Sequence, residues 1–153
     1  MTNVPVVPTL IGDLWTAPQV AQFTPVHQPA SGEVIARTPH CVEVDVDLAV
    51  TTAGAAFPAW SNTPATDRGQ ILFKYKELLE RDFEELSQLL VRENGKTLGE
   101  ARGDVRRGIE VVDFACGIGH LQKGEMLPQV AAGIDGTTTR EPIGVCAGIT
   151  PFN

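Results

Sequence analysis

The sequence predicts an α/β fold in which β-hairpins come first, helices fill the middle and a buried strand comes near the end. Three observations predict it: Pro-rich, β-leaning residues at positions 1–40, helical patterns from about 45 to 122, and an uncharged apolar run at Ile143–Ile149. That run shows no polar alternation, so both faces of the strand should be covered, as in a parallel sheet. Pro151 should end the strand, because it biases Thr150 away from the helical region.

Two hairpins are expected in the first 40 residues. Thr9–Trp15 can form a tight one around Gly12 and Asp13. The second would join Phe23–His27 to Glu33–Thr38 through the turn Pro29-Ala30-Ser31-Gly32.

Two amphipathic helices are expected next. Asp45 is a plausible N-cap for the first, which continues to Trp60. Thr66 is expected to open the second helix, because the segment around Pro64 interrupts the pattern. The second helix carries an apolar stripe at helical spacing, formed by Ile71, Leu72, Tyr75, Leu78 and Leu79.

A third helix should begin at Asp82, which with Glu85 resembles a capping box, and should stop at Asn94-Gly95. Three amphipathic helices in succession are typical of core architecture.

A fourth, longer helix is expected over Leu98–Gln122, opened by a capping box of Thr97 and Glu100. Its sequence is apolar on two opposite sides, which predicts a helix packed on both. One side carries Leu98, Ala101, Val105, Ile109, Val112 and Cys116, and the other carries Val111, Phe114, Ile118 and Leu121.

Arg107 lies in the centre of the second apolar side. Arg102 and Arg106 instead share a flank with Glu110 and Asp113, which reads as an ordinary solvated, ion-paired side. A guanidinium on an apolar side needs an anionic partner. One interpretation is a structural ion pair, or a stem that lies across the surface with its head in water. The other is a substrate carboxylate held by two parallel hydrogen bonds.

Composition limits the class of partner. The 153 residues carry a net charge of −7 with a pI near 4.9, which argues against nucleic acid or an anionic membrane surface. No apolar run approaches the roughly 20 residues that span a bilayer. The N-terminus resembles neither a signal nor a transit peptide, so a cytoplasmic location is the default expectation. The three histidines, His27, His40 and His120, lack metal-ligand spacing, so no metal site is expected.

Two segments carry a family resemblance. REPIGVCAGITPFN, at Arg140–Asn153, resembles the aldehyde dehydrogenase superfamily, whose members carry such a strand ending in I-x-P-[WF]-N. With ENGKTLGEARGDVRRGIEVVDFA upstream, the chain looks most like the CoA-acylating methylmalonate-semialdehyde dehydrogenase branch. The resemblance runs from about Val26 to the end, and the two motifs in this order make it specific.

The resemblance implies the N-terminal part of the aldehyde dehydrogenase fold, incomplete. Residues 1–125 would be the N-terminal part of the NAD-binding domain and 126–141 an oligomerisation strand segment. Residues 142–153 would be the first strand of the dinucleotide-binding sheet. Within the middle segment, alternation in Ile134–Arg140 suggests a half-exposed strand, which would be an unpaired edge without a partner.

The resemblance also implies a reaction. In the superfamily a Cys thiolate attacks the aldehyde, an Asn amide and a backbone N–H stabilise the oxyanion, hydride passes to NAD, and CoA or water takes the acyl group. Asn153 matches that Asn, and an amide suits the role because it is neutral at every working pH. Thr150, Pro151 and Phe152 match residues that line the cofactor cleft.

The same resemblance implies the ligands and the assembly. The substrate would be a small carboxylated aldehyde, which favours the carboxylate interpretation of Arg107. NAD and coenzyme A would be the cofactor and the acyl acceptor, in valine catabolism. The complete enzyme would be a homo-oligomer, a dimer or tetramer.

None of the three cysteines fits the nucleophile. Cys146 should be an inert thiol inside the buried strand, Cys116 lies on the core side of the long helix, and Cys41 lacks an activating neighbour. We therefore expect a portion of an enzyme that is inactive alone. The alternative is a non-catalytic helical interaction module derived from an aldehyde dehydrogenase, pairing through the Ile134–Arg140 edge.

Overall fold

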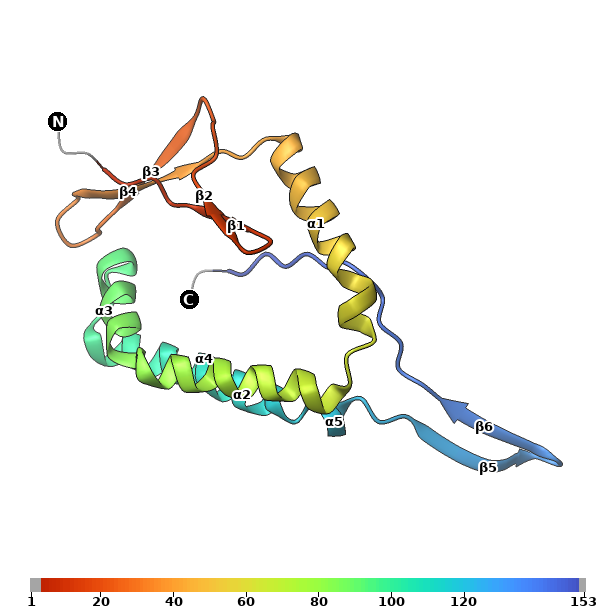
Figure 1. Cartoon of the computed structure of the whole chain (residues 1–153). Coiled ribbons are helices and arrows are strands. Elements are labelled where there is room, and N and C mark those ends of the chain that lie inside the picture. Colours follow the sequence, from red (N-terminus) through yellow and green to blue (C-terminus); the bar gives the residue numbers. More distant parts are fainter. Residues whose placement is uncertain (1–3, 152–153) are drawn as a thin grey trace.

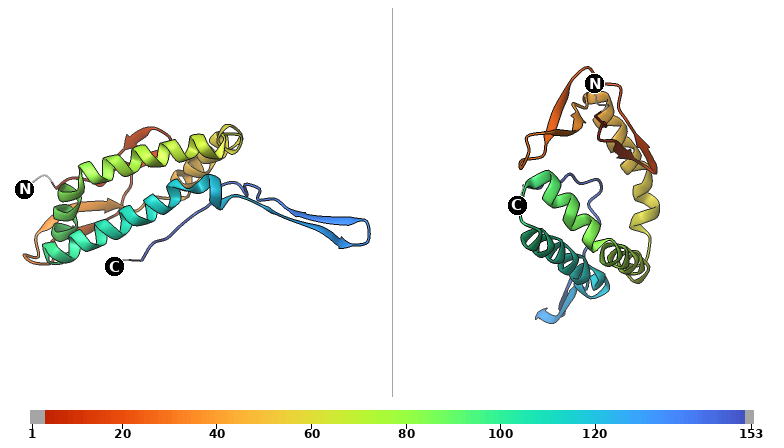
Figure 2. Two further views of the ribbon diagram at one scale, coloured as in Figure 1. Left: turned by 90° about the horizontal axis from the view of Figure 1, so that it is seen from below. Right: turned by 90° about the vertical axis from the view of Figure 1, so that its left-hand side faces the viewer.

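The computed structural model describes residues 4–151, whose elements form an open frame (Figure 1). Two β-hairpins lie at the N-terminal end, and α1 leads from them to a packed group made of α2, α3 and α4. The β5–β6 hairpin extends away from these helices in all three views (Figures 1 and 2). The elements are β1 (Thr9–Ile11), β2 (Leu14–Thr16), β3 (Phe23–His27), β4 (Val34–Pro39), α1 (Glu43–Ser61), α2 (Ala65–Arg81), α3 (Phe83–Asn94), α4 (Leu98–Cys116), α5 (Ile118–Leu121), β5 (Glu125–Ala131) and β6 (Ile134–Thr138).

Both predicted N-terminal hairpins are confirmed. β1 pairs antiparallel with β2, and Gly12 turns the chain between them at φ 63°. β3 pairs antiparallel with β4, with a bulge between Val26 and His27, and Gly32 takes φ 73° in the connecting turn. Both glycines therefore occupy a backbone region that other residues rarely adopt.

The start of α1 differs from the prediction. The helix begins at Glu43 with Val42 as its N-cap residue, so the expectation that Asp45 is the N-cap is wrong. Asp45 is the third helical residue, and its carboxylate accepts a hydrogen bond from the Val42 N–H at 2.9 Å. An acidic side chain that reaches back in this way satisfies a free donor at the helix terminus.

The start of α2 and the junction with α3 also differ from the predictions. Pro64, not Thr66, is the N-cap residue of α2. Asp82 does precede α3, but both of its carboxylate oxygens accept hydrogen bonds from Arg81 at 2.7 Å. The expected capping box with Glu85 is therefore wrong, because the carboxylate is occupied by a cation. The predicted end of α3 is confirmed, since Gly95 is the left-handed C-cap residue.

The long helix begins as predicted and ends early. Thr97 Oγ1 accepts a hydrogen bond from the Glu100 N–H at 3.3 Å, and the Glu100 carboxylate accepts one from the Thr97 N–H at 3.1 Å. A continuous helix to Gln122 is wrong, however, because α4 ends at Cys116 and Gly117 separates it from the short α5. Glycine has low helix propensity, which favours the break at this position.

One side of α4 forms the core of the described residues. Ala101, Ile109 and Cys116 are the buried apolar residues there, and Ser87 of α3 is the buried polar one. The prediction for this side is confirmed. The predicted burial of the other side is wrong, because none of the described elements covers Val111 or Phe114. Among residues 4–151, no helix combines the length and the apolar character needed to cross a bilayer.

Ion pairs connect α4 to the two helices beneath it. The predicted solvated, ion-paired flank is confirmed, and the guanidinium groups of Arg102 and Arg106 reach their partners across to another helix. The interhelical pairs are Arg102–Glu84, Arg106–Glu80 and Lys76–Asp113. The hydrogen bond from Arg106 lowers the pKa of Glu80, and that from Arg102 lowers the pKa of Glu84.

The projecting hairpin supplies a partner for the predicted strand at Ile134–Arg140. β6 covers Ile134–Thr138 and pairs antiparallel with β5, a strand that the sequence did not predict because of its internal Pro128. Gln129 takes φ 53°, and its N–H donates to Asp135 Oδ1 at 2.8 Å. The chain bulges at this place, since Leu127 pairs with Gly136 but Ala131 with Ile134.

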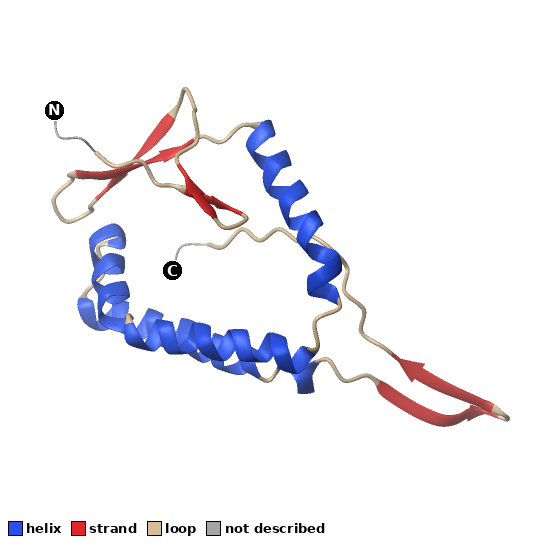
Figure 3. Ribbon diagram, in the orientation of Figure 1, coloured by secondary structure: helices blue, strands red, loops and turns tan. Residues whose placement is uncertain are grey.

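The predicted buried strand at Ile143–Ile149 is wrong for this structure. Residues 139–151 contain no strand and run as an extended loop past α1 (Figure 3). Ile143 is 90% exposed and Ile149 is 100% exposed. The physical reason is that no described strand pairs with the backbone of this segment, although residues 145–147 lie near β1.

We expect two glycine substitutions to differ in their effect on stability. Gly69→Ala in α2 places a Cβ at 3.2 Å from the Cys116 carbonyl oxygen, whereas Gly103→Ala in α4 meets no atom within 4 Å. Alanine in an exposed helix interior gains about 0.8–1 kcal/mol over glycine. Gly103→Ala should therefore raise the free energy of unfolding measured by urea denaturation. The free energy of unfolding of Gly69→Ala should be lower than that of Gly103→Ala by about 1 kcal/mol or more. Equal gains would contradict the close approach of α2 to the end of α4.

The interhelical pairs predict a loss of stability in acid. Because the folded state lowers the pKa of Glu80 and Glu84 below the usual value of 4.5, their contribution is complete above that value. It is lost as pH falls through the lowered values. A Glu80→Gln/Glu84→Gln variant should be less stable than the parent at pH 7, and the difference should shrink as pH falls below 4.5. Denaturation profiles that stay parallel from pH 7 to pH 3 would contradict this.

Candidate functional site

The predicted cofactor-contacting residues lie at the end of the extended segment. Thr150 and Pro151 are exposed, and neither makes a hydrogen bond within residues 4–151. Phe152 and the predicted oxyanion residue Asn153 lie outside the described residues. The four residues are consecutive in the sequence, so they would contribute to a single site.

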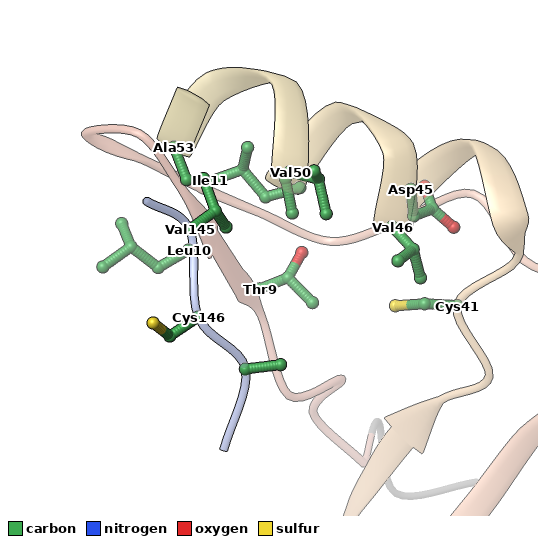
Figure 4. Close-up of a pocket in the computed structure, with 12 residues that line it drawn as sticks. Thr9, Leu10, Ile11, Cys41, Asp45, Val46, Val50, Ala53, Val145 and Cys146 are labelled. Carbon is green, nitrogen blue, oxygen red and sulfur yellow. The ribbon is translucent and has the colours of Figure 1, made fainter. Parts of the chain in front are cut away.

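An apolar groove of about 450 Å³ lies upstream of these residues, between β1, the first turns of α1 and residues 145–147 (Figure 4). Asp45 is its charged lining residue, and the other lining residues are mostly apolar. They are Thr9, Leu10, Ile11, Cys41, Val46, Ala49, Val50, Ala53, Val145, Cys146 and Ala147.

Two of the three cysteines line this groove, at separate places in Figure 4. Cys146 is exposed and its thiol lies 3.7 Å from the Gly144 carbonyl oxygen, so the expected burial of this thiol is wrong. Cys41 is also exposed and directly precedes the N-cap residue of α1, nearer to a helix N-terminus than expected. Cys116 is buried, as predicted. Cys146 is exposed because residues 143–149 do not pair with another strand and therefore are not buried in a sheet.

Arg107 lies on the uncovered side of α4. Its side chain is 83% exposed, and Val111 and Phe114, one and two turns further along, are each 69% exposed. At about 100° per residue these three positions fall within a narrow stripe of the helix surface. The stripe therefore carries one cation followed, toward the C-terminus of α4, by two large apolar side chains.

The partner of Arg107 is Glu110. Arg107 Nη1 donates to Glu110 Oε2 at 3.0 Å, and within the described residues the guanidinium makes no other hydrogen bond. Glu110 also lies close enough to Arg106 to interact with its charge, as the predicted flank requires, but its hydrogen bond is to Arg107. The spacing of three residues was a signal for this pair in the sequence.

Two other arginines show how a guanidinium in this protein holds a carboxylate. Arg102 donates from Nε and Nη2 to the two oxygens of Glu84, at 3.0 and 2.7 Å. Arg81 uses the same two nitrogens for Asp82. In Arg107 this edge makes no hydrogen bond within the described residues. It can therefore accept a carboxylate in the two-pronged arrangement that the other two arginines display.

The described residues offer a dinucleotide only a partial set of contacts. Thr150 supplies a hydroxyl and Pro151 an apolar ring, both accessible. A dinucleotide also needs donors for its pyrophosphate, usually at a helix N-terminus next to a tight turn. These two residues supply none. They fit one edge of such a ligand, and no hydrogen bond joins them to Arg107.

Comparison with known proteins places the chain in a family. The sequence pattern of the aldehyde dehydrogenase family matches residues 15–153. The chain is 44% identical to methylmalonate-semialdehyde dehydrogenase [acylating], mitochondrial, of Arabidopsis thaliana, covering 97% of this chain and 24% of that protein. It is 45% identical to malonate-semialdehyde dehydrogenase of Bacillus pumilus, covering 99% of this chain and 31% of that protein.

Structural comparison points to the same family. A crystal structure from Sinorhizobium meliloti, assigned as a methylmalonate-semialdehyde dehydrogenase and complexed with NAD, superposes with a TM-score of 0.92 at 37% identity. The match covers 100% of this chain and 31% of that one, which confirms the predicted α/β fold class as an incomplete part of the aldehyde dehydrogenase fold. The chain spans about a quarter to a third of the length of the relatives it matches. The chain belongs to the aldehyde dehydrogenase family.

Proposed function

We propose that these residues serve as the N-terminal part of an NAD-dependent dehydrogenase that oxidises malonate or methylmalonate semialdehyde to an acyl-CoA through a Cys thioester. The observation that carries this proposal is similarity over 97% or more of the chain to proteins named for these substrates, one of them as acylating. The superposition on an NAD complex supports the choice of cofactor.

The parts of the chain would have separate tasks. Residues 1–125 would form the N-terminal part of the NAD-binding domain, and 142–153 would add the first strand of the dinucleotide-binding sheet. Residues 126–141 would form an oligomerisation strand segment in a homodimer or homotetramer. The exposed, projecting β5–β6 hairpin supports this last assignment, because unpaired strand edges readily bind another chain.

Asn153 would act on the oxyanion. Its side-chain amide would donate a hydrogen bond to the oxygen of the thiohemiacetal as negative charge develops there. Thr150, Pro151 and Phe152 would contact NAD, which supplies the hydride acceptor when bound. The acyl acceptor would be coenzyme A.

Arg107 would select the substrate by its carboxylate. A guanidinium on the same exposed stripe as Val111 and Phe114, with one donor edge open, is suited to a short ligand with both a carboxylate and an apolar part. Uncharged aldehydes give such a group no partner, so it would favour semialdehydes that carry an acid.

These 153 residues alone would not turn over aldehyde. Cys116 is buried against α2, and the exposed Cys41 and Cys146 have no histidine or lysine among their hydrogen-bond partners in the described chain. A histidine or lysine partner is a common means of favouring the thiolate of a catalytic cysteine, and neither thiol has one among the described residues. A second candidate function, a non-catalytic interaction module, is favoured by the exposed hairpin. Self-association of the purified chain without dehydrogenase activity would support it.

We expect Arg107→Ala to change substrate selectivity. In an enzyme of the relatives' full length that carries these residues (the full-length enzyme), kcat/KM for malonate semialdehyde should fall about 10- to 100-fold, because charged hydrogen bonds are lost. The value for propanal should stay within about twofold. Arg102→Ala is the matched control, since its guanidinium is occupied by Glu84. Equal losses for both aldehydes would refute the carboxylate role.

We expect Asn153→Ala to lower kcat in the full-length enzyme by about 10²–10³-fold, because an oxyanion donor is removed. KM should change little, since the bond forms mainly in the transition state. Asn62→Ala, which removes a hydrogen bond to the Pro58 carbonyl at the end of α1, is the control and should leave kcat unchanged. Steady-state NADH formation measures both. A kcat of Asn153→Ala near that of the parent would exclude the role.

A further inference from the structure

The pair formed by Arg107 and Glu110 has an asymmetry that bears on the proposed substrate role. Glu110 accepts from Nη1 alone, at 3.0 Å, through one of its two oxygens. Glu84 and Asp82 instead occupy Nε and Nη2 of their arginines with both oxygens. Arg106 also meets its carboxylate partner, Glu80, through Nη1 alone, but its guanidinium lies over the Phe83 ring and its side chain is 45% exposed, against 83% for Arg107. Among the described residues, Arg107 is therefore the arginine of α4 whose Nε–Nη2 edge is both free of a carboxylate and open to a ligand.

This asymmetry follows from the positions of the residues. Glu110 lies three residues after Arg107, on the next turn of the same helix, so its short side chain reaches the guanidinium from the side facing the C-terminus of α4. Glu84 lies on a neighbouring helix and approaches Arg102 face to face. Glu110 thus holds Arg107 in place without covering its Nε–Nη2 edge.

Structural stabilisation is a weak explanation for the Arg107–Glu110 pair. Its side chains are 83% and 53% exposed, and exposed pairs of this spacing contribute little to folding. Arginine, however, loses considerable rotamer freedom when it binds a ligand, so a contact that restricts it beforehand improves affinity.

We infer that Glu110 is a positioning residue that holds Arg107 at Nη1 and presents its Nε–Nη2 edge to the carboxylate of the substrate. The inference rests on the proposed role of Arg107 and adds a second residue to it. Glu110 does not touch the substrate in this arrangement. Glu110 instead fixes the orientation of the guanidinium, whose Nε–Nη2 edge stays open on the stripe that also contains Val111 and Phe114.

The test is steady-state kinetics of the full-length enzyme with malonate semialdehyde and with propanal. Glu110→Ala should raise KM for malonate semialdehyde about 3- to 10-fold with kcat nearly unchanged, because the arginine is no longer held before binding. Values for propanal should not change. Glu110→Gln should restore KM to within about twofold of the parent, since its amide oxygen still accepts from Nη1.

Glu84→Ala is the matched control, because it also removes a carboxylate from an arginine of α4. It should lower the melting temperature without changing either KM. An unchanged KM in Glu110→Ala would overturn the inference. A lower KM would overturn it as well, because Glu110 would then compete with the substrate. The proposed role of Arg107 is tested separately: if Arg107→Ala discriminates between the two aldehydes and Glu110→Ala does not, only the inference fails.

Discussion

Burial of one side of α4 is the contact on which the described structure depends. Ala101 and Ile109 are fully or almost fully buried, and α2 and α3 both pack against this helix. Burying a side chain such as Ile109 contributes about 1.5–3 kcal/mol. Ala101 is small enough to let the helices approach closely. The capping box of Thr97 and Glu100 fixes where the helix starts, and so sets which residues face the core.

One side of α4 stabilises the fold, and the opposite side carries the residues of the proposed substrate site. On the buried side, apolar contacts and the flanking interhelical ion pairs hold the three helices together. The opposite side makes no comparable contacts within residues 4–151, and it carries Arg107 and Glu110. A rigid helix anchored on one side is a suitable base for a ligand-gripping group on the other, since catalysis and binding need positions held to within fractions of an ångström.

Local signals in the sequence predicted most of the fold. Turn glycines located both N-terminal hairpins, Gly95 located the end of α3, and the spacing of Ala101 and Ile109 identified the core side of α4. These features depend on residues close together in the chain. The errors came where the choice of partner decides. Asp82 binds Arg81 instead of capping a helix, and the apolar run at Ile143–Ile149 is a strand only where another strand pairs with it.

The candidate site could also be predicted only in part from the sequence. Arg107 could be singled out, because a charge on an apolar stripe is visible in the sequence. The direction of its open edge could not, because it depends on which nitrogen Glu110 occupies. Thr150 and Pro151 could be placed next to each other, but sequence alone says nothing of what lies across from them.

The bulge in β5 has a consequence for solubility. A projecting ribbon with exposed strands offers its backbone to any other extended chain, which is a common start of aggregation. Pro128 has no N–H to offer, and the next N–H, of Gln129, is already donated to Asp135. A strand that approached the free edge of β5 would therefore find no donor at Pro128. The missing donor at Pro128 limits random strand addition at this place, so that pairing along β5 is favoured with a partner strand whose register leaves this position unpaired.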